Sequence, residues 1–324
     1  MKITVIGGVN VDVSGMSLKP VRKADSNPAR IRINSGGVGR NIAENLFRLG
    51  AAVIFVSAVG DDVFAEFLRE RFAATGLDAS RLIVRKDMGT GLYILLLEPA
   101  GGLFAAVNSM EAVESITPAD LENVRNDAGA SDLVVLDANL LPETLDAAAR
   151  LAEDVPLMAD TVSAEKAGRV AGILPRLSLL KTNRAEAAAL AGFPLDTEEA
   201  LREGCRKLLS MGLKEICVTL GPGGALCASE EGMFTLPTLP AETVNVNGAG
   251  DAFAAGAAWH YCLGGGAGTP AGRGTAARGL FGSAAAAITV ECDGAVCENI
   301  TAEKVYERLA AVSNCGCIKN RREP

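Results

Sequence analysis

Hydrophobic and polar positions follow two recurring patterns along the chain. Short runs of Ile, Val and Leu predict buried strands, and longer segments with apolar residues three or four positions apart predict helices. The predicted elements are residues 3–6, 42–49, 53–58, 63–74, 133–136, 143–152, 179–180, 187–190 and 215–219. Because strands and helices alternate in this order, the pattern predicts an α/β fold with a mostly parallel sheet.

Two segments interrupt the alternation. Residues 11–34 are rich in polar turn residues, and residues 90–107 read as two strands joined by Pro99-Ala100-Gly101-Gly102. We expect these segments to form a small sheet that projects from a domain spanning residues 1–312. Residues 313–324 are expected to form a C-terminal tail.

Composition and charge narrow the choice of partner. The chain has 324 residues, of which 49% are hydrophobic and 4% aromatic, and its formal net charge is −8. Because negative charge repels a polyphosphate backbone, we expect a small metabolite and not a nucleic acid. The opening residues lack the pattern of a signal peptide, and the uncharged residues 252–272 are rich in Ala and Gly, which is typical of a buried helix followed by a loop. We therefore expect a cytoplasmic protein without a membrane partner.

Cysteine and histidine positions argue against several catalytic classes. Of the eight cysteines, Cys292 and Cys297 lie five positions apart and Cys315 and Cys317 two apart, and neither spacing is that of a zinc knuckle. Reduced thiols are expected rather than disulfides, because no secretion signal is recognised. The one histidine, His260, lies in an apolar run, so a Ser-His or Cys-His catalytic pair is not expected.

The most informative motif is residues 245–251, where a strand-like approach enters a glycine turn and a helix begins. The backbone N–H groups of Gly248, Ala249 and Gly250 are predicted to point at an anion, with the helix dipole behind them. Asp251 adds a carboxylate that could accept the proton of an attacking hydroxyl. The alternative is that Asp251 only stabilises the first helical turn, by ~0.3–1 kcal/mol, and the same dipole is expected to lower its pKa.

A second glycine cluster, which includes Gly36 and Gly37, opens the predicted helix that carries Asn41. Asn10 and Asp12 follow the first strand and its glycine turn, at the strand edge where open α/β sheets bind ligands. Paired hydroxyls of a sugar are natural partners for these amide and carboxylate groups. The alternative is that the glycines and the Asn-Val-Asp segment only form ordinary turns.

Two further motifs are compatible with a nucleotide. Asn183 and Glu186 have the spacing of a capping box, worth ~1 kcal/mol, and their oxygens are equally compatible with Mg²⁺ or phosphate. Thr219, Gly221 and Gly224 follow a predicted strand and form either a loop that passes nucleotide phosphates or a hairpin turn.

In this order, the motifs resemble those of the ribokinase-like (PfkB) carbohydrate kinases, and the resemblance spans nearly the whole chain. The early signature is matched by Gly36-Gly37, Asn41, Ala43, Gly50 and Gly60, and the late one by residues 245–251. The resemblance implies a three-layer fold with a small sheet as substrate lid, and phosphoryl transfer from ATP with Mg²⁺. It also implies the following roles: catalytic base for Asp251; anion hole for Gly248, Ala249 and Gly250; sugar binding for Asp12, Gly37 and Asn41; Mg²⁺ and phosphate binding for Asn183 and Glu186; ATP binding for Thr219, Gly221 and Gly224.

Within the family, the sequence is most similar to the pseudouridine kinase subgroup. This likeness rests on residues 24–28, 36–43, 108–110, 137–139 and 162–166. It implies that the product is pseudouridine 5′-phosphate, whereas the wider family resemblance implies that the lid also forms a homodimer surface. The residues that it implies for contact with the nucleoside are Ser26, Asn139 and Lys166, although Lys166 also reads as a solvated helix charge.

Three positions depart from the commoner family pattern. Asn247 replaces a usual Thr, Thr182 replaces a frequent Pro, and Asn245 replaces a frequent Asp. The last change removes a carboxylate near the place where relatives bind a monovalent cation, and residues 292–294 are an unusual version of the other half of that site. Potassium activation is therefore not expected.

Other functions stay open at this point. A kinase of the same fold acting on ribose, a hexose or adenosine would carry the same motifs, and so would a metabolite-binding relative that has lost catalysis. A dinucleotide-dependent oxidoreductase is disfavoured, because the first turn, Gly7-Gly8-Val9-Asn10, lacks the required glycine spacing.

Overall fold

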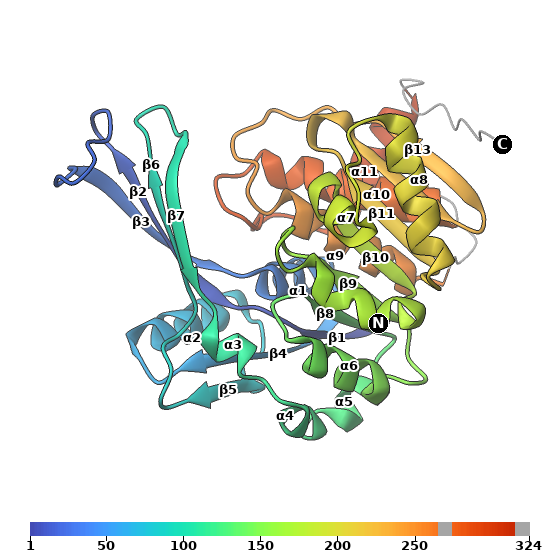
Figure 1. Cartoon of the computed structure of the whole chain (residues 1–324), viewed down its shortest axis with the longest axis horizontal. Coiled ribbons are helices and arrows are strands. Elements are labelled where there is room, and N and C mark those ends of the chain that lie inside the picture. Colours follow the sequence, from blue (N-terminus) through green and yellow to red (C-terminus); the bar gives the residue numbers. More distant parts are fainter. Residues whose placement is uncertain (265–273, 315–324) are drawn as a thin grey trace.

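The main sheet of the protein has nine strands. The computed structural model describes residues 1–264 and 274–314, and in them the strand order is β13-β12-β11-β10-β9-β8-β1-β4-β5 (Figure 1). Neighbouring strands from β11 to β5 are parallel, whereas β12 and β13 are antiparallel additions at one edge. The bounds are β1 Lys2–Ile6, β4 Ala52–Gly60, β5 Leu82–Arg85, β8 Leu133–Asp137, β9 Leu157–Asp160, β10 Leu179–Asn183, β11 Glu215–Thr219, β12 Ala225–Ser229 and β13 Gly232–Leu236.

Helices cover both faces of this sheet, which gives three layers. Side chains of β1 show how the core is divided, because Ile3 and Val5 pack into one hydrophobic cluster and Ile6 into the other. The first cluster includes α1 Val38–Arg48, α2 Val63–Thr75, α9 Ala249–Cys262, α10 Thr275–Val290 and α11 Ala302–Asn314. The second includes α3 Glu111–Glu114, α4 Pro118–Glu122, α5 Arg125–Gly129, α6 Pro142–Leu151, the 3₁₀ helix η1 Ala167–Arg176, α7 Arg184–Ala191 and α8 Glu198–Ser210.

This architecture confirms the predicted fold class. Local differences remain: the approach at Thr243 and Val244 is not a strand, and α11 continues to Asn314 within the expected tail. The helix predicted from residue 252 begins at Ala249, whereas most of the loop predicted after it lies outside the described residues. In the described part of the chain, no helix combines the length and hydrophobicity required to cross a membrane.

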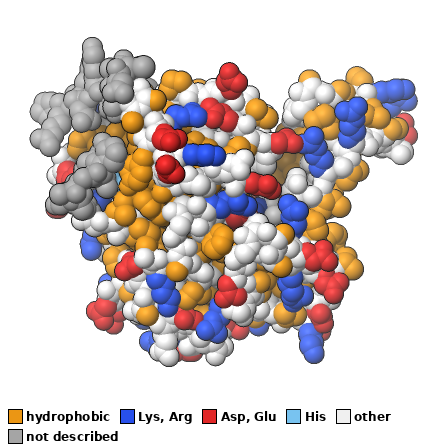
Figure 2. All heavy atoms as spheres, turned by 180° about the vertical axis from the view of Figure 1, so that it is seen from behind, with side chains coloured by type: hydrophobic (Ala, Val, Ile, Leu, Met, Phe, Trp, Pro, Cys, Tyr) orange, Lys and Arg blue, Asp and Glu red, His pale blue; other side chains and the backbone are white. Residues whose placement is uncertain are grey.

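A second sheet of four strands projects from the main body (Figure 1). Its order is β3-β2-β6-β7, with β2 and β6 parallel and the outer pairs antiparallel. The bounds are β2 Asn10–Ser17, β3 Ala29–Gly36, β6 Leu92–Leu97 and β7 Leu103–Ser109. These strands overlap the two segments that interrupt the main alternation of strands and helices. Figure 2 shows that the surface is hollowed between this projection and the main body.

The register gives the small sheet two different faces, because directly paired residues share a face. One row across the four strands consists of Asn34, Asp12, Tyr93 and Asn108, which are all polar. A row on the opposite face consists of Ile33, Val13, Ile94 and Val107, which are all apolar. At these rows the face that carries Asp12 is polar and the opposite face is apolar, whereas Leu95 and Met16 share the face of Asp12 farther along the strands.

Close packing fixes helix α9 against α10. Gly256 and Gly282 lie at the contact, and a Cβ at Gly256 would come within 3.0 Å of both Gly282 Cα and Ala285 Cβ. Trp259 of α9 stacks on Phe281 of α10, with 4.9 Å between ring centroids. Small residues and an aromatic stack therefore hold α9 rigidly, which matters because α9 begins at the predicted anion-binding turn.

The cysteines differ in part from the expectation of reduced thiols. Cys292 and Cys297 form a disulfide across the loop after α10, and that prediction was wrong for this pair. Sequence spacing missed it because a chain reversal in this loop brings the two Cα atoms to 5.5 Å. The free thiols in the described residues are Cys205, Cys217, Cys227 and Cys262. Cys315 and Cys317 lie outside those residues.

Candidate active site

The turn before α9 has the form that the sequence predicts. Gly248 is the N-cap residue with φ of 76°, and a Cβ there would lie 1.9 Å from the carbonyl oxygen of Ala295, so only glycine fits. Helical N-termini carry N–H groups without intrahelical partners, which favours an anion at this place. Of the predicted amides, that of Ala249 makes one long contact of 3.4 Å with Val246 O.

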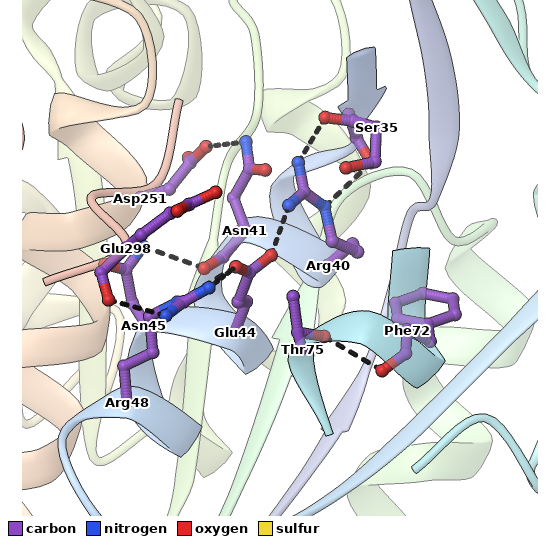
Figure 3. A network of polar contacts seen from close by, with 11 residues as sticks. Ser35, Arg40, Asn41, Glu44, Asn45, Arg48, Phe72, Thr75, Asp251 and Glu298 are labelled. Atoms are coloured by element: carbon purple, nitrogen blue, oxygen red, sulfur yellow. Dashed lines mark hydrogen bonds and ion pairs between the residues drawn. The ribbon is translucent and has the colours of Figure 1, made fainter. Parts of the chain in front are cut away.

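Asp251 lies in the first turn of α9 and meets α1. Gly37 is the N-cap residue of α1, which places Asn41 in the first turn of that helix. Asn41 Nδ2 donates a hydrogen bond of 2.6 Å to Asp251 Oδ2, as Figure 3 shows. Both side chains are buried, and Asn41 Oδ1 has no hydrogen-bond partner in the described part of the chain. Such a buried unpaired acceptor costs about 1–3 kcal/mol, and these costs concentrate at functional sites.

The environment of Asp251 reverses the expected direction of its pKa. Burial raises the pKa of Asp251 to about 7, and the neighbouring Asp160 carboxylate adds to the rise. Lys181, the hydrogen bond from Asn41 and the charge of Arg40 act in the opposite direction. The prediction of a lowered pKa was wrong, because it considered the helix dipole and not the loss of solvent. A carboxyl group with this pKa is suited to general base catalysis near neutral pH.

Asn10, Asp12, Gly36 and Gly37 form one corner of the site. Asn10 Nδ2 donates a hydrogen bond of 2.6 Å to Asp12 Oδ1. A Cβ on Gly36 would lie 2.4 Å from the same oxygen, so the missing side chain leaves room for the carboxylate. Burial raises the pKa of Asp12, although the Asn10 hydrogen bond and Arg40 oppose the rise.

Arg40 was not predicted, although it lies between these parts. Its guanidinium is buried, forms an ion pair of 2.6 Å with Glu44 and donates to the carbonyl oxygen of Ser35 (Figure 3). Its charge acts on both Asp12 and Asp251. Arg40 thus ties the end of β3 to α1 and brings positive charge close to both carboxylates.

Asn139 and Lys166 are brought together, whereas Ser26 is not. Lys166 Nζ donates a hydrogen bond of 2.8 Å to Asn139 Oδ1, and burial lowers the pKa of Lys166. Asp137 connects this pair to the glycine turn that follows β1. Its carboxylate accepts hydrogen bonds from the N–H groups of Gly8 at 2.8 Å and of Asn139 at 2.9 Å. Ser26 lies exposed in the turn between β2 and β3, and in the described residues it contacts none of the other predicted site residues.

The remaining candidates lie along the carboxyl edge of the main sheet. Asn183 ends β10 directly beside Thr219, which ends β11. Gly221 and Gly224 form the turn to the antiparallel strand β12, which includes the 3₁₀ turn η2 Gly221–Gly223. The hairpin interpretation of this motif is therefore confirmed, and a role in ATP binding stays a prediction.

The capping box at α7 is also present. Asn183 Oδ1 accepts from the N–H of Glu186 at 3.0 Å, and Glu186 Oε2 accepts from the N–H of Asn183 at 2.9 Å. Thr161 Oγ1 donates to the same Glu186 oxygen at 2.6 Å. Both carboxylate oxygens of Glu186 thus have protein donors, since Asn183 Nδ2 lies 2.5 Å from Oε1.

Three groups of residues near the site could not be found from the sequence motifs. The first is the polar row that Asn34, Tyr93 and Asn108 form with Asp12, which depends on strand register. Arg40 is the second, and the third is the ion pair between Lys181 and Asp160. One available signal was that Asp137 and Asp160 end parallel strands, where ligands of open sheets bind.

A model of the pfkB family of carbohydrate kinases matches residues 1–301. The chain belongs to this family. PfkB carbohydrate kinases are phosphotransferases that act on hydroxyl groups. The chain is 33% identical to pseudouridine kinase of Escherichia coli K12 over 258 residues, which cover 79% of this chain and 82% of that protein.

Solved structures agree with the family assignment. The carbohydrate kinase from Agrobacterium tumefaciens is 31% identical, with a TM-score of 0.80 over 95% of this chain and 97% of that one. The ribokinase from Thermotoga maritima is 23% identical, with a TM-score of 0.81 over 96% and 99% of the two chains. The expected ribokinase-like fold is confirmed. The family match supports a PfkB kinase rather than a dinucleotide-dependent oxidoreductase.

The raised pKa of Asp251 predicts a pH-dependent effect of Asp251→Asn on stability. Between its ordinary pKa of 3.8 and about 7, Asp251 binds more protons in the folded than in the unfolded state, so stability falls as pH rises. Asn cannot ionise, and urea unfolding should therefore show the variant to be more stable above about pH 7, by about 1.4 kcal/mol per unit of pKa shift. The gain should disappear near pH 4. The exposed Asp196→Asn is the control, and an equal gain at all pH values would contradict the raised pKa.

Proposed function

We propose that this protein is an ATP-dependent kinase that phosphorylates the 5′-hydroxyl of pseudouridine. The observation that carries the proposal is the hydrogen bond between Asn41 and Asp251. It joins Asn41, a predicted sugar-binding residue, to the predicted anion-binding turn, and it does so at a carboxyl group whose pKa burial raises to about 7. The choice of pseudouridine is supported by the identity of 33% to the Escherichia coli pseudouridine kinase.

The proposed reaction is an in-line transfer. Asn10, Asp12 and Asn41 hold the ribose hydroxyls, with Gly36 and Gly37 leaving room for them. The 5′ oxygen forms a bond to the γ-phosphorus of ATP while the bond from that phosphorus to the β–γ bridging oxygen breaks and ADP leaves. Asp251 accepts the proton of the hydroxyl.

The amides at the start of α9 supply the second half of the chemistry. Gly248, Ala249 and Gly250 offer backbone N–H groups and the positive end of the helix to the transferred phosphoryl group. Rigid packing of α9 on α10 keeps these donors in place, so little reorganisation is needed when charge develops.

Asn183, Glu186, Thr219, Gly221 and Gly224 are proposed to form the nucleotide side. Mg²⁺ bound to ATP would neutralise phosphate charge. The oxygens of Glu186 already accept protein hydrogen bonds, and in the described residues no three His, Cys, Asp or Glu side chains cluster as a metal site. Asn183 and Glu186 would therefore hold a hydrated Mg²⁺ through water, since Mg²⁺ commonly keeps several waters.

The nucleobase is proposed to lie between the small sheet and the pair Asn139–Lys166. The exposed side chains of Asn34 and Asn108 flank Asp12 and Tyr93 on the polar face, where they can meet a polar ring. Ser26 would contribute only if the turn between β2 and β3 moves toward the site.

Potassium is not proposed as an activator. Asn245 Nδ2 donates a hydrogen bond of 2.7 Å to the carbonyl oxygen of Asp293, and Asn245 Oδ1 accepts from the N–H of Asn247 at 3.0 Å. The neutral amide thus joins the two loops directly. The amide of Asn245 therefore makes the link between these loops that a bound monovalent cation would otherwise make.

A substrate panel tests the proposed function. The acceptors are pseudouridine, uridine, adenosine, ribose and a hexose, each with MgATP. We expect kcat/KM for pseudouridine to exceed that for ribose or a hexose because the site would bind both ribose and a polar base, and to exceed that for the other nucleosides because the chain is 33% identical to a pseudouridine kinase. ADP release is the measurement. Faster phosphorylation of ribose would assign the chain to another activity of the same family, and binding without ADP release would indicate a non-catalytic relative.

The role of Asp251 predicts a specific kinetic defect. Asp251→Asn should lower kcat by about 10²–10⁴-fold, the usual contribution of a general base, while calorimetry should find nucleoside binding retained. Asp12→Asn is the contrasting variant, because loss of a ribose contact should mainly raise KM. Near-normal kcat in Asp251→Asn would refute the assignment.

The apolar face of the small sheet is proposed to bind a second copy of the chain. Ile31, Ile33, Ile94 and Val107 are 62%, 50%, 44% and 63% exposed. Continuous exposed apolar area of this kind is typical of an interface, and two identical faces related by a twofold axis can cover each other. The small sheet would then contact substrate with one face and its partner with the other.

The proposed dimer predicts that charge on the apolar face separates the subunits. Ile33→Lys combined with Val107→Lys should reduce the mass in sedimentation analysis from that of a dimer to that of a monomer, because two lysines per copy would be buried without partners. Val63→Lys on α2 is the control, since Val63 is 72% exposed and lies on another element. A wild-type protein that sediments as a monomer would contradict the proposal.

A further inference from the structure

A buried ion pair beneath the first turn of α9 has been given no binding or catalytic role so far. Lys181 Nζ lies 2.9 Å from Asp160 Oδ2, as an ion pair rather than a well-aligned hydrogen bond. The side chains are only 7% and 1% exposed. Replacing a buried ion pair by apolar residues is often neutral or stabilising, so stability alone does not explain why charges lie here.

The position of the pair relates it to Asp251. Lys181 is in the middle of β10, and its neighbours Leu179 and Leu180 pack on opposite sides of the main sheet. By alternation, Lys181 shares the side of Leu179, which is also the side of α9. A Cβ on Gly250 would lie 2.9 Å from Lys181 Nζ, so the ammonium reaches the residue next to Asp251.

We propose that the Lys181–Asp160 ion pair positions opposed charges beneath the first turn of α9 and thereby sets the pH range in which Asp251 acts as a base. This inference rests on the proposed role of Asp251. Lys181 and Asp160 are positioning residues, because they act through Asp251.

The charged groups around Asp251 support this inference. They come from three elements: Asp160 from β9, Lys181 from β10 and Arg40 from α1. Each cation has a carboxylate of its own, since Arg40 pairs with Glu44 at 2.6 Å and Lys181 pairs with Asp160. Among the described residues, neither of the cations that act on Asp251 is therefore free to hold it permanently ionised.

The two members of the pair act on Asp251 in opposite directions. Asp160 disfavours the ionised form of Asp251, and Lys181 favours it. An unpaired lysine at this place would leave Asp251 ionised at low pH and a weak base, whereas an unpaired aspartate would keep it protonated at neutral pH. In the ion pair these two effects oppose each other, and burial then raises the pKa of Asp251 to about 7.

Glycine at position 250 is part of the arrangement. Any side chain there would displace the ammonium, because the space beside the Gly250 Cα is occupied by Lys181 Nζ. Gly250 thus has a second function besides its amide. It allows a positive charge to approach the turn from the sheet side, opposite to solvent.

The test uses two single variants with opposite expected results. In Lys181→Met the midpoint of Asp251 ionisation should rise, and in Asp160→Asn it should fall, in each case by about one pH unit or more, as expected for charges a few ångströms away. The midpoint is measured in the full-length, ligand-free protein by ¹³C NMR of labelled aspartate carboxyls, with the Asp251 signal assigned from its loss in Asp251→Asn. Lys304→Met on the exposed side of α11 is the matched control and should leave the midpoint unchanged.

The same variants are then assayed with MgATP and pseudouridine. The acidic limb of the kcat/KM profile, which reports the free enzyme, should move with the NMR midpoint, and a merely structural role would not produce this. Lys181→Arg keeps the charge and should restore the wild-type midpoint. If either single variant fails to fold, the double variant Lys181→Met/Asp160→Asn leaves no unpaired charge, and its midpoint should lie below that of the wild type because Asp160 has the larger effect.

Unchanged NMR midpoints in the single variants, or in the double variant where only that one folds, would overturn the inference. The outcome for the proposed function is separate. If the midpoints shift but the protein has no kinase activity, the proposed function is refuted and the electrostatic effect of the ion pair on Asp251 is supported. If the kinase is active and its pH profile is the same in all the variants, only the proposed effect of Lys181 and Asp160 on Asp251 is refuted.

Discussion

Burial of the Asp251 carboxyl group is the constraint on which the rest of the site depends. The group must be shielded from water for α9 to pack against α1, yet it must be able to lose a proton near neutral pH for the chemistry. Asn41 meets the first requirement by donating to the carboxylate. The second requires charges of both signs nearby, and these come from strands and helices that are far apart in the sequence.

Sequence reasoning succeeded where chemistry is local. The alternating elements, the glycine turn at Gly248 and the capping box at Asn183 each depend on a few neighbouring residues, so the chain predicts them directly. Sequence reasoning failed for Arg40 and Lys181, because their roles depend on the groups that they meet in the folded chain and not on their sequence neighbours. The direction of the Asp251 pKa was wrong for the same reason, because the degree of burial is a property of the folded chain.

The small sheet illustrates how one strand pattern can encode two surfaces. Because successive side chains point to opposite faces, Asp12 belongs to a polar row and Val13 to an apolar one. Arg32 extends from the polar face and forms an exposed ion pair of 3.2 Å with Asp293 in the loop that also carries the disulfide. One exposed ion pair thus connects the projection to the loop behind the anion-binding turn.

The separation of Asn41 and Asp251 along the chain has a consequence for biosynthesis. The two residues that meet at the centre of the site are 210 positions apart. A nascent chain must therefore emerge from the ribosome well past residue 251 of 324 before this contact can form. Until then the early β-α units have no α9 to cover them, and a translation product that stops short of this helix can neither hold nor consume a substrate.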